Sequence, residues 1–153
     1  MAARAAGREL RPEDEDFDDD ESAPAPYVPL LVRDVMPTAV VTARPDQLVS
    51  ELDLTQVTGM PVLDAAGAMV GVISKTDIET RAVDAETRVE DLMSRRIKVC
   101  RPNNTVAEAA AMMLKYKVHR LPVVKSNAKT GEISLVGIIT RTDVYYALET
   151  GRL

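Results

Sequence analysis

The sequence predicts a mixed α/β (α+β) fold in which two β-α-β-β-α repeats pack around a pseudo-two-fold axis. The first observation is a short stretch that occurs twice. Residues 70–78 read V-G-V-I-S-K-T-D-I, and residues 136–144 read V-G-I-I-T-R-T-D-V. In each copy a β-branched apolar run predicts a buried strand. The hydroxyl residue and the aspartate that follow are typical of a helix start. An internal repeat of this kind is the strongest guide to the architecture.

Three further motifs recur in the same order upstream of these stretches, which is the second observation. They pair residues 34–36 with 91–93 (D-V-M, D-L-M), 44–46 with 101–103 (R-P-D, R-P-N) and 59–62 with 120–123 (G-M-P-V, R-L-P-V). One repeat of about 60 residues buries little apolar surface by itself. The two repeats should therefore pack through their sheets, with both strand-to-helix joints facing a shared cleft.

The first repeat is expected to begin with an arm and a short helical turn, residues 27–36, before Pro37. Residues 40–42 predict a short strand, and Asp46 can cap a helix that carries Leu48, Val49 and Leu52. This helix should be short, because Met36 to Pro61 spans 25 positions whereas Met93 to Pro122 spans 29. The remaining elements are a hairpin of residues 61–63 and 69–74 across the turn residues 64–67, and a helix from residue 76 to about 82.

The second repeat predicts the same elements at greater length. They are a strand at 97–100, a helix at 105–117, strands at 121–124 and 133–140 joined across 126–131, and a closing helix at 143–148. Val106, Ala109, Ala110 and Met113 have the spacing of one buried helix face. The expected organisation is an acidic, disordered leader at 1–26, a first repeat at 27–82, a linker at 83–89 and a second repeat at 90–153.

The leader has a composition unlike the rest of the chain. Residues 1–26 hold three basic and nine acidic side chains, a net charge of −6 against −5 for the whole chain. Such a segment buries too little apolar surface to order itself, which predicts a solvated leader. The alternative is an acidic arm that docks on a basic partner. The remainder is nearly neutral and has one Phe and no Trp, which argues against nucleic-acid binding.

Composition also limits the possible chemistry and compartment. The single cysteine, Cys100, excludes an internal disulfide and fits a reducing compartment. No apolar run reaches the roughly 18–20 residues that span a membrane, so we expect a soluble intracellular protein, cytoplasmic or in the plastid stroma. No phosphate-binding Gly-rich loop, His-Glu-x-x-His motif or metal-ligand cluster is present. The sequence therefore predicts neither an enzyme nor a metal site.

The order D-ϕ-M, R-P-D/N, P-V and G-ϕ-I-S/T-x-T-D, present twice over residues 30–149, resembles the cystathionine-β-synthase (CBS) domain. Two such domains in tandem resemble a stand-alone Bateman module. The resemblance implies that an adenosine ligand lies in the cleft, with no further cofactor. Its ribose is then held by the aspartate of S/T-x-T-D, and its phosphate faces the residues just before the P-V strand of the opposite repeat.

Carried over to this chain, the resemblance implies two sites. The first comprises Val72, Ser74, Thr76, Asp77, Lys98, His119, Arg120 and Pro122. The second comprises Val41, Thr58, Gly59, Pro61, Ile138, Thr140, Thr142 and Asp143. Only the first set contains cations, so it should prefer AMP, ADP or ATP. The second set suits an uncharged adenosine-type ligand or none, and S-adenosylmethionine is a further candidate.

The expected function is therefore a regulatory module that senses an adenine nucleotide and modulates an unknown partner protein. A homodimer is expected, with candidate apolar surface at Met112, Tyr116, Tyr145 and Tyr146. Two alternatives remain. One is a ligand-free dimeric interaction module, and the other is a redox regulator that acts through Cys100 or a thioredoxin-type partner.

Structural roles are also open for the residues of the two sites. Asp77 and Asp143 can simply cap helices, while Lys75, Arg120 and Arg141 can be solvated charges. His119 can likewise be structural.

Overall fold

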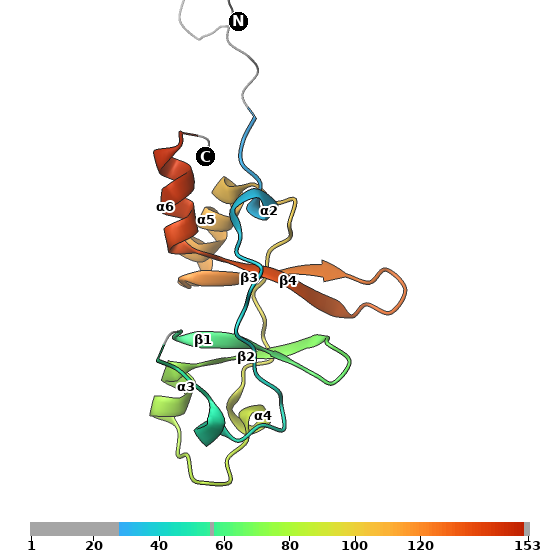
Figure 1. The fold of residues 1–153 in the computed structure, drawn as a ribbon, viewed down its shortest axis with the longest axis vertical. Coiled ribbons are helices and arrows are strands. Elements are labelled where there is room, and N and C mark those ends of the chain that lie inside the picture. The colour runs from blue at the N-terminus through green and yellow to red at the C-terminus, as the bar shows by residue number, and fades with distance from the viewer. Residues whose placement is uncertain (1–27, 56, 152–153) are drawn as a thin grey trace, which may run out of the picture.

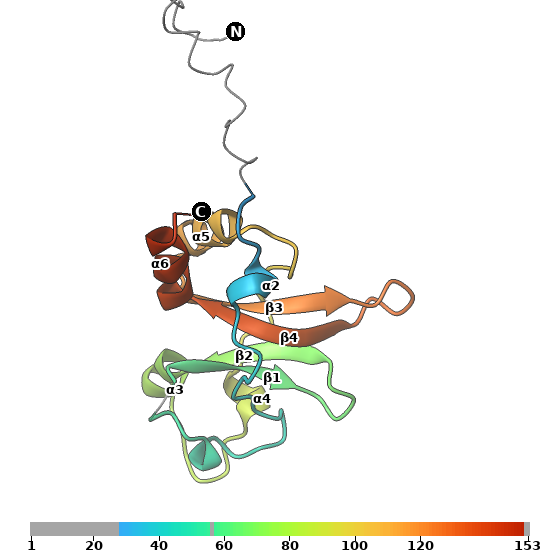
Figure 2. The same ribbon diagram turned by 45° about the horizontal axis from the view of Figure 1, so that its top comes forward.

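The structure, a computed structural model, describes residues 28–55 and 57–151, so the predicted leader at 1–26 lies outside the described residues. Two antiparallel hairpins, β1–β2 and β3–β4, lie against each other in the middle of the molecule, with the helices on their outer sides (Figures 1 and 2). This arrangement confirms the predicted fold class. The elements are α2 Val32–Val35, the 3-10 turn η2 Val49–Glu51, β1 Gly59–Leu63, β2 Met69–Ser74, α3 Lys75–Thr80, α4 Val89–Leu92, α5 Val106–Tyr116, β3 Arg120–Ser126, β4 Ile133–Thr140 and α6 Arg141–Glu149.

The predicted hairpin turns form as expected. Asp64 accepts hydrogen bonds through Oδ1 from the backbone N–H groups of Ala66 and Ala68, both at 2.9 Å. Gly67 follows with a φ of +86°, a conformation that glycine adopts without strain. In the longer loop of the second repeat, Asn127 takes the role that Asp64 has in the first: its Oδ1 accepts a hydrogen bond from the backbone N–H of Lys129.

The predicted strands at 40–42 and 97–100 are wrong. Each is reduced to one bridge residue, Ala43 beside Val62 and Cys100 beside Val123, in parallel pairing. Ala43 exchanges 2.9 Å hydrogen bonds with Pro61 and Leu63, and Cys100 exchanges 3.0 Å bonds with Pro122 and Val124. Extending either pairing by two residues would need an N–H from the proline, which has none. The proline of each P-V motif therefore ends the pairing.

The predicted helix after Asp46 is also much shorter than expected, since only the three residues of η2 are helical. Asp46 does not cap it; the Asp46 carboxylate lies 3.4 Å from Nε of Arg44, and Leu48 is at the N-cap position. Just beyond the turn, Asp53 accepts from the backbone N–H and hydroxyl of Thr55. With four residues fewer than the second repeat, the chain makes one turn and then extends toward β1.

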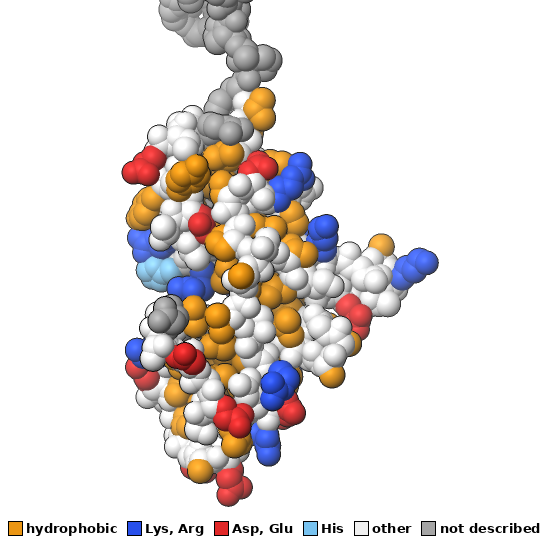
Figure 3. Space-filling view, viewed as in Figure 1, with side chains coloured by type: hydrophobic (Ala, Val, Ile, Leu, Met, Phe, Trp, Pro, Cys, Tyr) orange, Lys and Arg blue, Asp and Glu red, His pale blue; other side chains and the backbone are white. Residues whose placement is uncertain are grey.

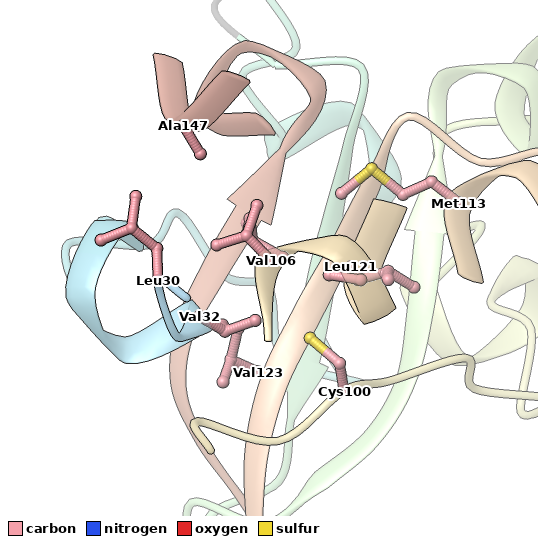
Figure 4. Packing of buried hydrophobic residues seen from close by; sticks show 10 residues of the cluster. Leu30, Val32, Cys100, Val106, Met113, Leu121, Val123 and Ala147 are labelled. Atoms are coloured by element: carbon pink, nitrogen blue, oxygen red, sulfur yellow. The ribbon is translucent and has the colours of Figure 1, made fainter. Parts of the chain in front are cut away.

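The first helical turn of each repeat packs in the hydrophobic core of the other repeat: α2 in the second core and α4 in the first. Leu30 and Val32, from the start of the first repeat, pack with Val106, Leu121 and the rest of the second-repeat core (Figure 4). In turn, α4 contributes Val89 and Leu92 to the core of the first repeat, whose members are Ala43, Val49, Met60, Val62, Ile73, Val89 and Leu92. The sequence repeats and the packing units therefore differ at these two turns. Within the described residues, no helix is long and apolar enough to cross a membrane.

Candidate functional site

The two strand-to-helix joints are built alike. At the start of α3, the Ser74 hydroxyl accepts from the backbone N–H of Asp77 (3.1 Å), and Oδ2 of Asp77 accepts from the backbone N–H of Ser74 (2.9 Å). At the start of α6, Oδ2 of Asp143 accepts from the backbone N–H (2.8 Å) and the hydroxyl (3.0 Å) of Thr140. Each motif therefore forms a reciprocal capping box. The structural role predicted for both aspartates is present.

Each joint is also fixed to the start of the neighbouring strand. The backbone N–H of Lys75 donates to the carbonyl of Thr58 at 2.7 Å, and that of Arg141 donates to the carbonyl of His119 at 3.0 Å. These two bonds place the first turn of α3 beside β1, and the first turn of α6 beside β3. Side chains from both ends of a hairpin therefore border the same space.

A cavity of about 480 Å³ lies between the two hairpins. It is lined by seven of the eight residues predicted for the first site, namely Val72, Ser74, Thr76, Lys98, His119, Arg120 and Pro122. Asp77 is half-buried and hydrogen-bonded to Ser74 but is not part of the lining. Figure 3 shows basic side chains beside the chain's single histidine, at the hollow where the two halves of the molecule meet.

Residues of the second predicted site divide into two groups. Thr58, Gly59, Pro61 and Ile138 line the same cleft as the first site. The remaining predicted members, Val41, Thr140, Thr142 and Asp143, lie outside its lining.

Arg120 joins the two predicted sites. Its Nη2 donates to the hydroxyl of Thr58 at 3.3 Å, across the interface between the repeats. The second predicted site, which includes Thr58 and for which the sequence predicted no cation, therefore has the Arg120 guanidinium beside it in the tertiary structure.

The cleft carries five basic side chains and one acidic one in its lining. The basic residues are Lys75, Arg96, Lys98, Lys117 and Arg120, and the acidic residue is Glu79. Within residues 28–55 and 57–151, none of these five cations forms a salt bridge. Lys98 lies over the Tyr116 ring, with Nζ 5.0 Å from the centroid.

Two of these cations were missed in the sequence. Arg96 lies two positions before Lys98 in an extended segment, so the period-two rule could have placed both on one side. Lys117 ends α5 in the left-handed conformation, with a φ of +57°, which local sequence did not signal.

Arg141 is held away from this cleft. Its Nη1 lies 2.6 Å from Nδ1 of His119, and its Nη2 donates to the Tyr145 hydroxyl at 3.4 Å. A second cavity of about 440 Å³ lies beside these groups, between α5 and α6, with Met113, Leu114 and Val144 in its wall. His119 thus borders both cavities, and its Nδ1 acts as the acceptor for Arg141 when the imidazole is neutral.

Cys100 lies in the second core and is only 1% exposed. Burial raises the pKa of the Cys100 thiol to about 11, and the nearby Arg101 charge offsets part of this effect. The thiolate is the reactive form of cysteine, so this environment makes the side chain a small apolar core residue.

Comparison with known proteins detects the same two repeats. The sequence model of the CBS domain matches residues 32–83 and again residues 89–150. The CBS domain-containing protein YhcV of Bacillus subtilis is 30% identical over 121 residues, which cover 74% of this chain and 81% of that protein.

The chain belongs to the CBS domain family. Two solved structures of the family resemble this CBS pair. CBSX2 in complex with AMP is 29% identical, with a TM-score of 0.66, and the match covers 81% of this chain and 99% of that one. The cytosolic domain of the Mg²⁺ channel MgtE in complex with ATP is also 29% identical, with a TM-score of 0.62 over 73% of this chain and 46% of that one.

Proposed function

We propose that this CBS pair is a non-catalytic regulatory module that binds an adenine nucleotide in the cleft between its hairpins and thereby controls a partner protein. The observation that carries the proposal is the cleft itself: five basic side chains, none of which forms a salt bridge with another described residue, line a cavity together with apolar side chains. A ligand suited to it has an apolar ring and several negative charges. The AMP bound to CBSX2 and the ATP bound to the MgtE domain have both properties.

The ribose would be held at the capped start of α3. Asp77 uses Oδ2 for the cap, and among the described residues no hydrogen bond reaches its Oδ1. A carboxylate can cap a helix and accept from a ribose hydroxyl at the same time, because its two oxygens offer about four lone pairs. Capping and ligand binding are therefore compatible roles for this residue.

The phosphate would be held by Arg120 and Lys98, from the second repeat. Arg120 now donates to the neutral hydroxyl of Thr58. A phosphate oxygen is a stronger acceptor, since charge-assisted hydrogen bonds are shorter and roughly twice as strong as neutral ones. Binding would therefore move the guanidinium from Thr58 to the ligand, change the contact between the hairpins and bias the pair toward one arrangement.

The test is calorimetry of AMP, ATP and adenosine binding to three single variants. Asp77→Ala should weaken AMP at least about 10-fold, because hydrogen bonds to a charged group are worth ~1.5–3 kcal/mol and ~1.4 kcal/mol is one decade. Arg120→Ala should weaken AMP and ATP but spare adenosine. Asp143→Ala should have the smaller effect, because Ser74 and Thr76 beside Asp77 line the cavity whereas Thr140 and Thr142 beside Asp143 do not.

Lys125→Ala is the matched control, since Lys125 is an exposed cation at the far end of β3. Equal losses with Lys125→Ala and Arg120→Ala would show a general charge effect and contradict the proposal. Loss of AMP binding in Asp143→Ala with retention in Asp77→Ala would reverse the assignment of the ribose site. If S-adenosylmethionine binds more tightly than AMP, the ligand of the cleft is S-adenosylmethionine and not a nucleotide.

A ligand-free interaction module is the second candidate, and one observation favours it. Large exposed apolar side chains gather on α5 and α6: Leu114 (81% exposed), Tyr145, Tyr146 and Leu148. If no adenine nucleotide raises the melting temperature, this helical face carries the function. The redox alternative has less support, because Cys100 is buried and protonated at neutral pH.

A further inference from the structure

We propose that the acidic stretch at residues 13–21 of this chain occupies the basic cleft and competes there with the phosphorylated ligand. The docking rests on the charge of the cleft and the reach of the chain. The competition rests in addition on the function proposed above. The N-terminal segment would then be an intramolecular inhibitor that sets the nucleotide concentration at which the module responds.

The charge of the cleft is concentrated rather than spread over the molecule. Residues 28–151 contain 15 basic and 15 acidic side chains and are neutral overall. The cleft lining alone holds five basic residues and one acidic residue, a net charge of +4, so the rest of this region is −4. Charges of one sign lining a concave surface focus the field and attract an anionic group into it.

The occupant has the matching charge and an apolar centre. Residues 13–21 read E-D-E-D-F-D-D-D-E, eight carboxylates around Phe17, the only phenylalanine of the chain. Carboxylates form strong hydrogen bonds with guanidinium and ammonium groups. An aromatic ring flanked by anions also matches the apolar part of the cleft lining, which includes Pro61, Val72, Val118, Pro122 and Ile138. A nucleotide has the same pair of features, a flat ring and negative charge.

The chain is long enough to reach. Val28 is the first described residue, and Phe17 lies eleven positions before it. Eleven residues span at most about 36–40 Å, while a folded unit of this size has a radius of gyration of about 14 Å. The span is more than twice this radius, and the hairpins that border the cleft lie in the middle of the molecule (Figure 1), so residues 13–21 can reach the cleft.

The tether also makes a weak contact effective. A short tether gives an effective concentration in the millimolar range, so a contact with millimolar affinity is half-formed. Because most of the cleft cations are exposed, salt should weaken the contact. A second copy or a separate acidic protein would have to reach the same concentration in solution to compete with this segment.

The first experiment measures binding of AMP and of inorganic pyrophosphate to the full-length chain by calorimetry, at 50 and 500 mM NaCl. It compares the natural chain with a leader-neutral chain, in which the eight carboxylates of residues 13–21 become Asn or Gln. The leader-neutral chain should bind both anions about 3–10-fold more tightly at low salt and equally at high salt. Phe17→Ala should give part of the gain for AMP.

Glu86→Gln/Glu90→Gln is the control, because it removes two exposed negative charges outside the leader and the cleft lining. A gain of the same size per charge in this control would show a general effect of net charge and overturn the proposal.

The second experiment needs no nucleotide. Backbone amide shifts of the natural and leader-neutral chains should differ at Ser74, Lys98 and Arg120. They should agree at Lys125 and Lys129, at the other end of the β3–β4 hairpin from Arg120. If the amide shifts differ but the protein does not bind AMP, the docking of the leader is supported and the proposed function is contradicted. Identical shifts and equal AMP affinities would overturn the docking. Differences that grow with protein concentration would assign the contact to a second copy.

Discussion

At the scale of single residues, the helix cap and the proposed ribose acceptor are the same side chain. Ser74 and Asp77 satisfy each other's backbone N–H groups at the start of α3, which explains their spacing without any ligand. The same bonds hold the Asp77 carboxylate in one orientation at the edge of the cleft. A site built on such a cap costs little additional ordering when a ligand binds, because the side chain is already fixed.

Cys100 gives a prediction at this scale. With a pKa of about 11, only about one thiol in ten thousand is ionised at pH 7. In the native protein Cys100 should therefore stay unmodified by a colorimetric thiol reagent over hours, and should react at once in denaturant. Lys129→Cys, in the exposed hairpin loop, should react within seconds in the same assay. Fast native labelling of Cys100 would revive the redox hypothesis.

At the scale of elements, one proline in each repeat limits the sheet. Pro61 and Pro122 lie in β1 and β3 and pair with β2 and β4. This pairing needs neither their carbonyls nor an N–H, because the carbonyls face the other edge and accept from Ala43 and Cys100. The missing N–H affects the other edge, where Ala43 and Cys100 each form a single bridge. The result is two-stranded hairpins instead of three-stranded sheets.

The capping box of α5 gives a prediction with a pH dependence. Glu108 accepts from the backbone N–H of Thr105 and from the side chain of Asn104, and these bonds hold the pKa of its carboxyl below the usual 4.5. Because the pKa is lower in the folded state, the stabilisation is present above the unfolded pKa and is lost as the pH falls through the folded value. Glu108→Ala should therefore lower the melting temperature at pH 7.

The difference between the natural chain and Glu108→Ala should shrink as the pH falls below about 4.5 and vanish below the folded pKa. Glu108→Gln can still accept the backbone bond, so it should lose less at pH 7 and show no titration. A constant difference between Glu108→Ala and the natural chain from pH 3 to pH 7 would contradict this assignment.

At the scale of the whole molecule, the repeated motifs contact each other crosswise. A Cβ on Gly137 would lie 2.6 Å from Sδ of Met36 and 2.9 Å from the carbonyl oxygen of Pro37. A Cβ on Gly71 would lie 2.8 Å from Sδ of Met93. The glycine within each of the strands β2 and β4 is thus required by the D-ϕ-M turn that packs on its hairpin. Met36 precedes Gly137 by 101 positions, and Met93 follows Gly71 by 22.

Gly137→Ala should destabilise the fold by ~1–3 kcal/mol, because overpacking forces the neighbours to move. Thermal unfolding measures this as a drop of several degrees. In a double-mutant cycle, Met36→Ala should couple to Gly137→Ala, since it removes the nearest atom, and should not couple to Gly71→Ala. Equal coupling to both glycines would contradict the crosswise packing.

The helical face of the second repeat gives a prediction about assembly. We expect a homodimer that buries the exposed side chains of α5 and α6, to which the structure adds Leu114 and Leu148 as candidates. Met112, one of the predicted surface residues, instead packs partly into the core. Leu114→Glu should make the protein monomeric, because burying an unpaired charge in the interface is costly. Light scattering at tens of micromolar protein measures the change.

Val41→Glu is the control, because Val41 is 51% exposed in the first repeat, away from α5 and α6. A natural chain that is monomeric at this concentration would count against the dimer. A Leu114→Glu chain that stays dimeric would place the interface elsewhere.

The sequence alone determined the repeat, the two hairpins with the helices that follow them, and most of the cleft residues, because these depend on local signals. Periodicity, turn residues such as Asp64 and caps such as Ser74 act over a few positions, and Pro122 and Arg120 are adjacent to a recognisable strand. The tertiary structure decided what depends on distant chain segments. It decided that a proline ends each parallel pairing, that α2 and α4 exchange cores, and that Arg120 reaches Thr58 to join two predicted sites into one cleft. Those features arise from packing between segments dozens of residues apart, for which no local pattern exists.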